Sequence, residues 1–186
     1  DYNGMKFMSF GFLLGDSPAI MRGPMVSGYI QQLLTTVEWG ELDYLFIDMP
    51  PGTGDVQLSM MQNHKPVGAI IVSTPQDLAL IDAQRAANLF ESGKVPIIGL
   101  VENMSGYACP HCGEASDPFG KGGVEAASDA TGISFLGRIP LALEIRSASD
   151  SGTPPATGDG PEAEAFHSVA ARISDWLDNE APKEGA

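Results

Sequence analysis

The sequence is poor in cysteine, in basic residues and in long apolar runs, and each shortage argues against a class of protein. Only two of its 186 residues are cysteine, whereas small secreted disulfide scaffolds carry more. No apolar run reaches the roughly 18 residues of a membrane-spanning helix, and no signal peptide is visible. Ten Lys and Arg stand against 24 Asp and Glu, a formal net charge of -14. We therefore expect a cytoplasmic protein with neither nucleic acid nor a membrane as a partner, because both are bound through basic residues.

Apolar runs and helical spacing alternate along the chain. Strands are predicted over residues 6–11, 42–48, 67–73, 96–101 and 133–139, and helices over residues 25–37, 56–62, 77–92, 124–130 and 161–177. Residues 147–160, rich in Gly, Pro, Ser and Thr, predict a loop. This alternation predicts an α/β fold with a doubly wound, mainly parallel sheet. We expect one domain over residues 1–178 and a flexible acidic tail over residues 179–186.

The strongest motif is the segment Asp-Met-Pro-Pro-Gly-Thr-Gly-Asp at residues 48–55. Ligands of open parallel sheets bind outside the carboxyl ends of the strands, where Asp48 is expected to lie. A carboxylate there can hold Mg²⁺ directly or through water, and Gly52 and Gly54 would let backbone amides approach a phosphate. We interpret the segment as a nucleotide-binding loop. The alternative is a tight turn before a helix that Asp55 caps.

Cys109 and Cys112 have the spacing of two thiolates that share a metal ion or a cluster. A closed site needs four ligands, and the chain has no second cysteine pair, so a symmetry mate could supply the other two. His111, between the cysteines, is a possible additional ligand. A disulfide oxidoreductase is disfavoured, because its first cysteine must begin a helix and the residues after Cys112 predict a loop.

Residues 120–124, Gly-Lys-Gly-Gly-Val, look like the start of a phosphate loop. A working loop reads G-x-x-x-x-G-K-[ST], in which the late Lys reaches the phosphates and the hydroxyl binds Mg²⁺. Here the chain continues with Glu125 and two alanines, and the stretch follows Pro118 and Phe119 rather than a predicted strand. We therefore predict that this segment is not a phosphate loop.

Taken together, these stretches resemble the Mrp-type ATPases, iron–sulfur cluster carriers of the MinD-like, deviant-Walker class of P-loop proteins. The resemblance extends from about Phe10 to Pro154, and it is carried by the cysteine pair and by residues 21–25, 39–48, 49–58, 73–76, 101–104 and 136–141. It implies a P-loop NTPase fold, with ATP and Mg²⁺ as the cofactors of the complete protein. It also implies a homodimer that bridges a [4Fe-4S] cluster through Cys109 and Cys112 of each subunit, with a cluster donor and apo iron–sulfur proteins as partners.

The resemblance further implies roles for individual residues. Asp48 and Gly52 would be catalytic, in a switch loop at residues 48–54 that senses the γ-phosphate and Mg²⁺. Asn103 would read adenine through its side-chain amide, the alternative being an ordinary turn asparagine. Three consecutive residues would line the adenine pocket: Ile139, Pro140 and Leu141. Arg22 is either a site residue or a solvated cation at a helix start.

The sequence also departs from the family pattern. The family begins with a strand and a G-K-G-G-V-G-K-[ST] loop, followed by an Asp-rich switch near a G-P-S sequence, and these 186 residues contain neither the loop nor the switch. We expect the chain to start where the middle of such a protein lies, and to neither bind ATP tightly nor hydrolyse it alone. Met21 stands where the family usually has Trp.

The sequence is also compatible with two other functions. One is a zinc-bridged dimer whose cysteine site is purely structural. The other is a MinD-like positioning ATPase, which would need a basic amphipathic terminal helix, whereas the end of this chain is acidic.

Overall fold

The computed structural model describes residues 2–14, 23–50, 52 and 54–182, and the chain divides into two compact units, Asp1–Lys65 and Pro66–Ala186. The predictions for Met21, Arg22 and the last four residues of the tail lie outside the described residues, as do Pro51 and Thr53 of the predicted switch loop. No described helix is long and apolar enough to span a membrane.

The first unit contains three helices within its described residues. They are α1 (Phe10–Leu14), α2 (Gly23–Thr36) and α3 (Asp55–His64). Helices α2 and α3 pack together, and Ile30 of α2 is buried, as are Met60 and Met61 of α3. A polar contact of 2.9 Å between His64 Nε2 and Gln31 Oε1 joins the same two helices. The sequence prediction of helices over residues 25–37 and 56–62 is confirmed.

Two strands predicted in this unit are wrong. Residues 42–48 form no strand, and residues 6–9 are irregular before α1 begins at Phe10. Both predictions rested on apolar composition, but a strand also needs a neighbour with which to pair its backbone groups. Among the described residues neither segment has such a neighbour, and Phe46 is 72% exposed.

The second unit is built on a parallel sheet. Its strands are β1 (Ala69–Ser73), β2 (Ile97–Glu102) and β5 (Phe135–Arg138), in the spatial order β1-β2-β5. Helix α4 (Asp77–Ser92) connects β1 to β2, and α5 (Gly123–Thr131) precedes β5. Both strand pairs are parallel, as the near-continuous apolar runs of the sequence predicted.

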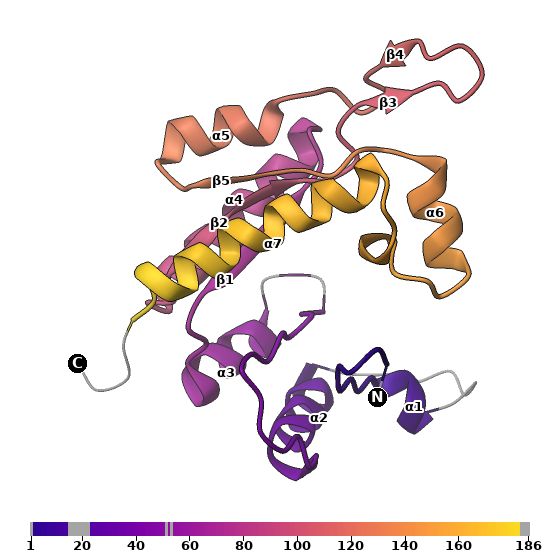
Figure 1. Ribbon diagram of the computed structural model, residues 1–186. Coiled ribbons are helices and arrows are strands. Elements are labelled where there is room, and N and C mark those ends of the chain that lie inside the picture. Colours follow the sequence, from indigo (N-terminus) through magenta and orange to yellow (C-terminus); the bar gives the residue numbers. More distant parts are fainter. Residues whose placement is uncertain (1, 15–22, 51, 53, 183–186) are drawn as a thin grey trace. The chain divides into compact units, whose positions relative to one another are not determined.

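Helices cover both faces of this sheet (Figure 1). On one face, Ile71 and Leu100 form a buried cluster with Ala87 of α4 and Val124 of α5. The other face is covered by α7 (Pro161–Asn179), whose apolar side, including Val169 and Trp176, packs against buried strand residues. The doubly wound α/β fold predicted from the sequence is therefore confirmed.

Glycine at position 99 allows β2 and β5 to approach closely. A Cβ at Gly99 would lie 2.6 Å from both Leu136 Cγ and the Ser134 carbonyl oxygen, well inside van der Waals contact. Gly93 ends α4 as predicted, with its N–H donating to the Leu89 carbonyl at 3.0 Å.

The remaining elements lie outside the sheet core. They are β3 (Tyr107–Ala108), β4 (Ala115–Ser116), α6 (Leu143–Asp150) and a 3₁₀ turn, η1 (Pro155–Thr157). The loop predicted over residues 147–160 is wrong in part, because its first four residues complete α6. Ile145 packs against the α7 side of the core, and this tertiary contact outweighs the weak helix propensity of the serines that follow.

Candidate functional site

The loop that begins at Asp48 is braced by the side chain of Gln57. Gln57 is only 5% exposed; its amide nitrogen donates to the Pro50 carbonyl at 2.8 Å, and its Oε1 accepts the Gly54 N–H at 3.1 Å. Gln57 therefore ties the two ends of the loop together. Gly52, between them, has φ +107°, a conformation that only glycine adopts readily.

Asp48 itself is exposed, and no hydrogen bond or ion pair joins it to another described residue. Helix α3 begins at Asp55 with Gly54 as its N-cap residue, so the predicted cap at Asp55 is one residue too late. The sequence did not lead us to predict the hydrogen bonds of Gln57, although a Gln three residues after the cap is a recognised sign of a helix start.

The cysteines lie in the turn of the β3–β4 hairpin. The Cys109 N–H donates to the Glu114 carbonyl at 2.9 Å, and the Gly113 N–H donates back to the Cys109 carbonyl at 2.8 Å. Gly113 closes the turn with φ +73°. Both thiols are free; Cys109 is half-buried and Cys112 is exposed. The residues after Cys112 form no helix, although Ala115 and Ser116 of the predicted loop form the short strand β4. Cys109 therefore does not begin a helix, and the argument against a disulfide oxidoreductase stands.

The turn favours the ionised form of Cys109. Hydrogen bonds from the backbone N–H groups of Cys112 and His111, and a further one with the Cys112 thiol, lower the pKa of the Cys109 thiol below its usual value of 9.0. A thiolate is the form that binds metals. The local backbone thus prepares one of the two cysteines for metal or cluster binding.

A buried carboxylate, Glu102, lies at the carboxyl end of the sheet. It is the last residue of β2 and is fully buried. Its oxygens accept hydrogen bonds from the Ser105 hydroxyl at 2.5 Å, the Gly122 N–H at 3.1 Å and the Val124 N–H at 3.0 Å. Arg138 Nε, at the end of β5, lies 3.2 Å from the same carboxylate.

Opposing effects act on the charge of Glu102. Burial raises the pKa of its carboxyl, but the hydrogen bonds from Ser105, Val124 and Gly122 and the positive charge of Arg138 together hold that pKa below 4.5. Glu102 is therefore an ionised carboxylate. The signal that could have revealed it is a single charged residue at the end of an otherwise apolar strand.

Glu102 also explains why the glycine-rich residues 120–124 do not form a phosphate loop. Gly122 and Val124 lie at the start of α5, where free backbone N–H groups would attract an anion. In this structure the anion is the carboxylate of Glu102. The prediction that residues 120–124 do not form a phosphate loop agrees with this geometry.

The residues predicted to contact adenine also gather at this edge of the sheet. The Asn103 N–H donates to the Ser73 carbonyl at 2.7 Å, and its side-chain oxygen accepts the Met104 N–H at 2.9 Å. Ile139 is buried, and its carbonyl accepts the Ser105 N–H at 3.0 Å. Asn103 and Ile139 thus flank the start of the chain segment that leads to the cysteine hairpin.

Pro140 and Leu141 line a pocket of about 230 Å³ that also contains Cys109. The pocket is smaller than the roughly 300–1,000 Å³ of most whole-ligand sites, so it can enclose part of a ligand such as a base. Its remaining lining residues are Tyr107, Ala108, Pro110, Ala142, Leu143, Glu144 and Glu162. The structure therefore brings two predicted base-pocket residues together with one predicted cluster ligand.

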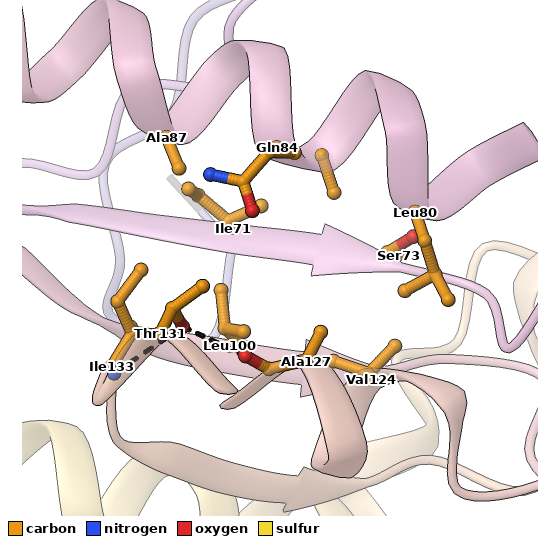
Figure 2. Close-up of a pocket in the computed structure, with 11 residues that line it drawn as sticks. Ile71, Ser73, Leu80, Gln84, Ala87, Leu100, Val124, Ala127, Thr131 and Ile133 are labelled. Carbon is orange, nitrogen blue, oxygen red and sulfur yellow. Dashed lines mark hydrogen bonds between the residues drawn. The ribbon is translucent and has the colours of Figure 1, made fainter. Parts of the chain in front are cut away.

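A second cavity lies inside the sheet–helix core (Figure 2). Leu80, Gln84 and Ala87 of α4 border it on one side, with Val124, Ala127 and Thr131 of α5 on the other. Its volume of about 20 Å³ has room for about one water molecule. It is a packing defect of the core and cannot hold a nucleotide.

Comparison with known proteins places the chain in a family. A family model described as ParA: NUBPL iron-transfer P-loop NTPase matches residues 1–174. The iron-sulfur cluster carrier protein of Methanocaldococcus jannaschii is 49% identical over 174 residues, covering 92% of this chain and 60% of that protein. The iron-sulfur cluster transfer protein NUBPL of Dictyostelium discoideum is 47% identical over 178 residues, covering 94% of this chain and 55% of that protein. The chain thus spans 55–60% of the length of these two relatives.

Solved structures agree with this relationship. A nucleotide-binding protein from Archaeoglobus fulgidus, in complex with ADP, matches with 42% identity and a TM-score of 0.65 over 78% of this chain and 56% of that one. The septum site-determining protein MinD of Pyrococcus horikoshii, complexed with Mg-ADP, shares the fold at 23% identity, with a TM-score of 0.59 over 87% of this chain and 60% of that one. The chain therefore belongs to the NUBPL iron-transfer family of P-loop NTPases.

Proposed function

We propose that this chain is the cluster-holding part of an ATP-dependent iron–sulfur carrier, with the cluster as its cargo at Cys109 and Cys112. One observation carries the proposal: the two thiols lie on an accessible turn and form an incomplete ligand set. Within the described ranges, no group of three or more His, Cys, Asp and Glu side chains could hold a metal ion. A site that must release its cargo benefits from such an open arrangement. Relatives named as cluster carriers support the same function.

A second copy of the chain would complete the site. Two cysteines from each copy supply the four thiolates that a [4Fe-4S] cluster takes, and a twofold axis through the cluster makes the two halves equivalent. The exposure of Cys112 is compatible with this arrangement, because a partner must approach the turn directly. In the cytoplasm, a donor protein would transfer the cluster to this dimer, and apo iron–sulfur proteins would receive the cluster from it.

ATP is the proposed cofactor of the complete protein. Asn103, Ile139, Pro140 and Leu141 would bind the base, and the pocket beside Pro140 and Leu141 has room for one. In the loop braced by Gln57, Asp48 would hold Mg²⁺ through its carboxylate and Gly52 would bring backbone N–H groups to the γ-phosphate. A relative with 42% identity is known in complex with ADP.

Anaerobic reconstitution with iron and sulfide tests the cluster proposal. The expected product is a brown dimer with about four irons per two chains, lost in the Cys109→Ala variant. A Ser116→Ala variant, changed on the same exposed hairpin, should reconstitute normally. A colourless dimer that retains zinc instead would make the cysteine site structural and would overturn the carrier function.

A separate assay tests the nucleotide proposal. The 186 residues lack the lysines of a phosphate loop, so the purified chain should show no ATP hydrolysis above buffer. ATPase activity that disappears in Asp48→Ala but persists in Asp43→Ala would contradict this expectation.

A further inference from the structure

The fully buried carboxylate of Glu102 has no part in the cluster or nucleotide chemistry described above, yet it lies at the root of the cysteine hairpin. We propose that Glu102 is a positioning residue, which fixes the orientation of the Cys109–Cys112 turn by holding Ser105. This inference rests on the proposed function, because it assigns Glu102 a role in presenting the two cluster ligands.

The carboxylate is a fixed point in the second unit. It ends β2, and it is held by the backbone of α5 through Gly122 and Val124 and by Arg138 at the end of β5. Arg138 is held in turn by an ion pair with Glu125 of α5. Three elements of the rigid core therefore determine where the carboxylate lies and how it is oriented.

Ser105 is the fourth donor, and it differs from the other three because it belongs to the segment that leads into the hairpin. Its hydroxyl donates to Glu102 at 2.5 Å, and its N–H donates to the Ile139 carbonyl at 3.0 Å. Ser105 is only 7% exposed. Both hydrogen bonds are thus shielded from water, and together they fix the position of this residue against β2 and β5.

The connection continues from Ser105 to the cysteines. The Leu141 N–H donates to the Gly106 carbonyl at 2.9 Å, and Tyr107, the first residue of β3, forms a parallel bridge with Leu141. Beyond Tyr107 the hairpin extends away from the sheet (Figure 1). There the backbone hydrogen bonds of the described residues 108–116 are those of the short β3–β4 ladder and the Cys109 turn. Because these hydrogen bonds all lie within the hairpin, the residues at its root determine the direction in which it leaves the sheet.

Hydrogen exchange in the apo chain tests this inference. Ser105→Ala removes the hydroxyl that donates to Glu102. A second variant, Glu102→Gln, weakens the same hydrogen bond by replacing the carboxylate that accepts it with an amide. Ser128→Ala is the matched control, since Ser128 is also buried and its hydroxyl binds the Ile133 carbonyl at the opposite end of α5. We expect Ser105→Ala to accelerate exchange of the amides over residues 105–116 by roughly 5- to 30-fold, the factor for one weakened buried interaction. Ser128→Ala should leave these amides within about twofold of the wild type.

Release of the cluster to an iron chelator is the second measurement, on the reconstituted protein. Ser105→Ala should speed release by a similar roughly 5- to 30-fold, whereas Ser128→Ala should not. Equal exchange over residues 105–116 in the two serine variants would overturn the inference, as would unchanged cluster release in Ser105→Ala. If the wild-type chain assembles no cluster, the carrier function fails, and the exchange experiment still decides whether Glu102 positions the hairpin.

Discussion

Replacing Glu102 by Ala should cost the second unit a large part of its stability. The substitution leaves two donors buried without an acceptor, the Ser105 hydroxyl and the Val124 N–H, each at a cost of about 1–3 kcal/mol. It also removes the buried half of an ion pair, whose loss typically costs about 3–5 kcal/mol. These costs overlap, and Arg138 is 34% exposed and keeps its contact with Glu125. We therefore expect a decrease of about 3–5 kcal/mol in the free energy of unfolding.

The assay is urea unfolding followed by circular dichroism at pH 7. Glu102→Gln should lose less, about 1–3 kcal/mol, because the amide keeps the shape and one acceptor oxygen but turns its NH₂ toward a backbone donor. Glu125→Gln is the control, since it changes the exposed partner of the same arginine and should cost at most about 1 kcal/mol. A loss below about 1 kcal/mol in Glu102→Ala would refute the account of the carboxylate as a buried, fully used acceptor.

The charge of Glu102 also predicts a pH dependence. The folded state lowers the pKa of this carboxyl below its usual value of 4.5, because burial, which raises the pKa, is outweighed by three hydrogen bonds and by the positive charge of Arg138. Its stabilising contribution is therefore complete above about pH 4.5 and is lost as the pH falls through the lower, folded pKa. Wild-type stability should fall more steeply than that of Glu102→Gln below pH 4.5, as measured by urea midpoints over that range. Parallel profiles for the two proteins would contradict the lowered pKa.

Three further predictions concern other parts of the chain. Gly99→Ala should destabilise it by about 1–3 kcal/mol in urea unfolding, because the new Cβ would collide with Leu136, whereas Gly28→Ala, in an open helical position, should be neutral or stabilising. Iodoacetamide should alkylate Cys109 with a rate–pH midpoint below 9.0, resolved by peptide mass spectrometry; a midpoint that is the same in the folded chain and in urea would contradict the effect of the turn. Trp176→Ala should cost roughly 2–4 kcal/mol in the same unfolding assay, since the ring packs on the α7 side of the sheet, and a change below about 1 kcal/mol would argue against that packing.

Much of the second unit could be predicted from sequence because its signals are local. Helix α4 was predicted at its observed bounds, since apolar spacing marks its length and Gly93 marks its end. The parallel strands followed from continuous apolar runs. The same reasoning failed for residues 42–48, where an equally apolar run has no paired neighbour among the described residues. Composition identifies segments that can form a strand, but pairing depends on the rest of the fold.

The candidate site, like the fold, could be predicted from sequence only in part. The cysteine turn and the glycines of the loop after Asp48 could be identified from sequence, because thiols at this spacing and glycine clusters each have a restricted set of uses. The place of Glu102 at the end of an apolar strand can be seen in the sequence, but its partners cannot, because they come from Ser105, from α5 and from β5, up to 36 residues away. Nor could the pocket that joins Cys109 to Pro140 and Leu141, since their proximity depends on the parallel bridge at Leu141.

The start of α5 is filled by an anion that belongs to the chain itself, and this has a consequence for competition between ligands. A tethered group acts at an effective concentration in the millimolar range or above, and the carboxylate of Glu102 is also held in place by Arg138. Free phosphate or a diffusing nucleotide would have to displace the Glu102 carboxylate, which is covalently part of the chain and cannot diffuse away. The glycine-rich segment before α5 is therefore not available as a second, unproductive binding site for ATP.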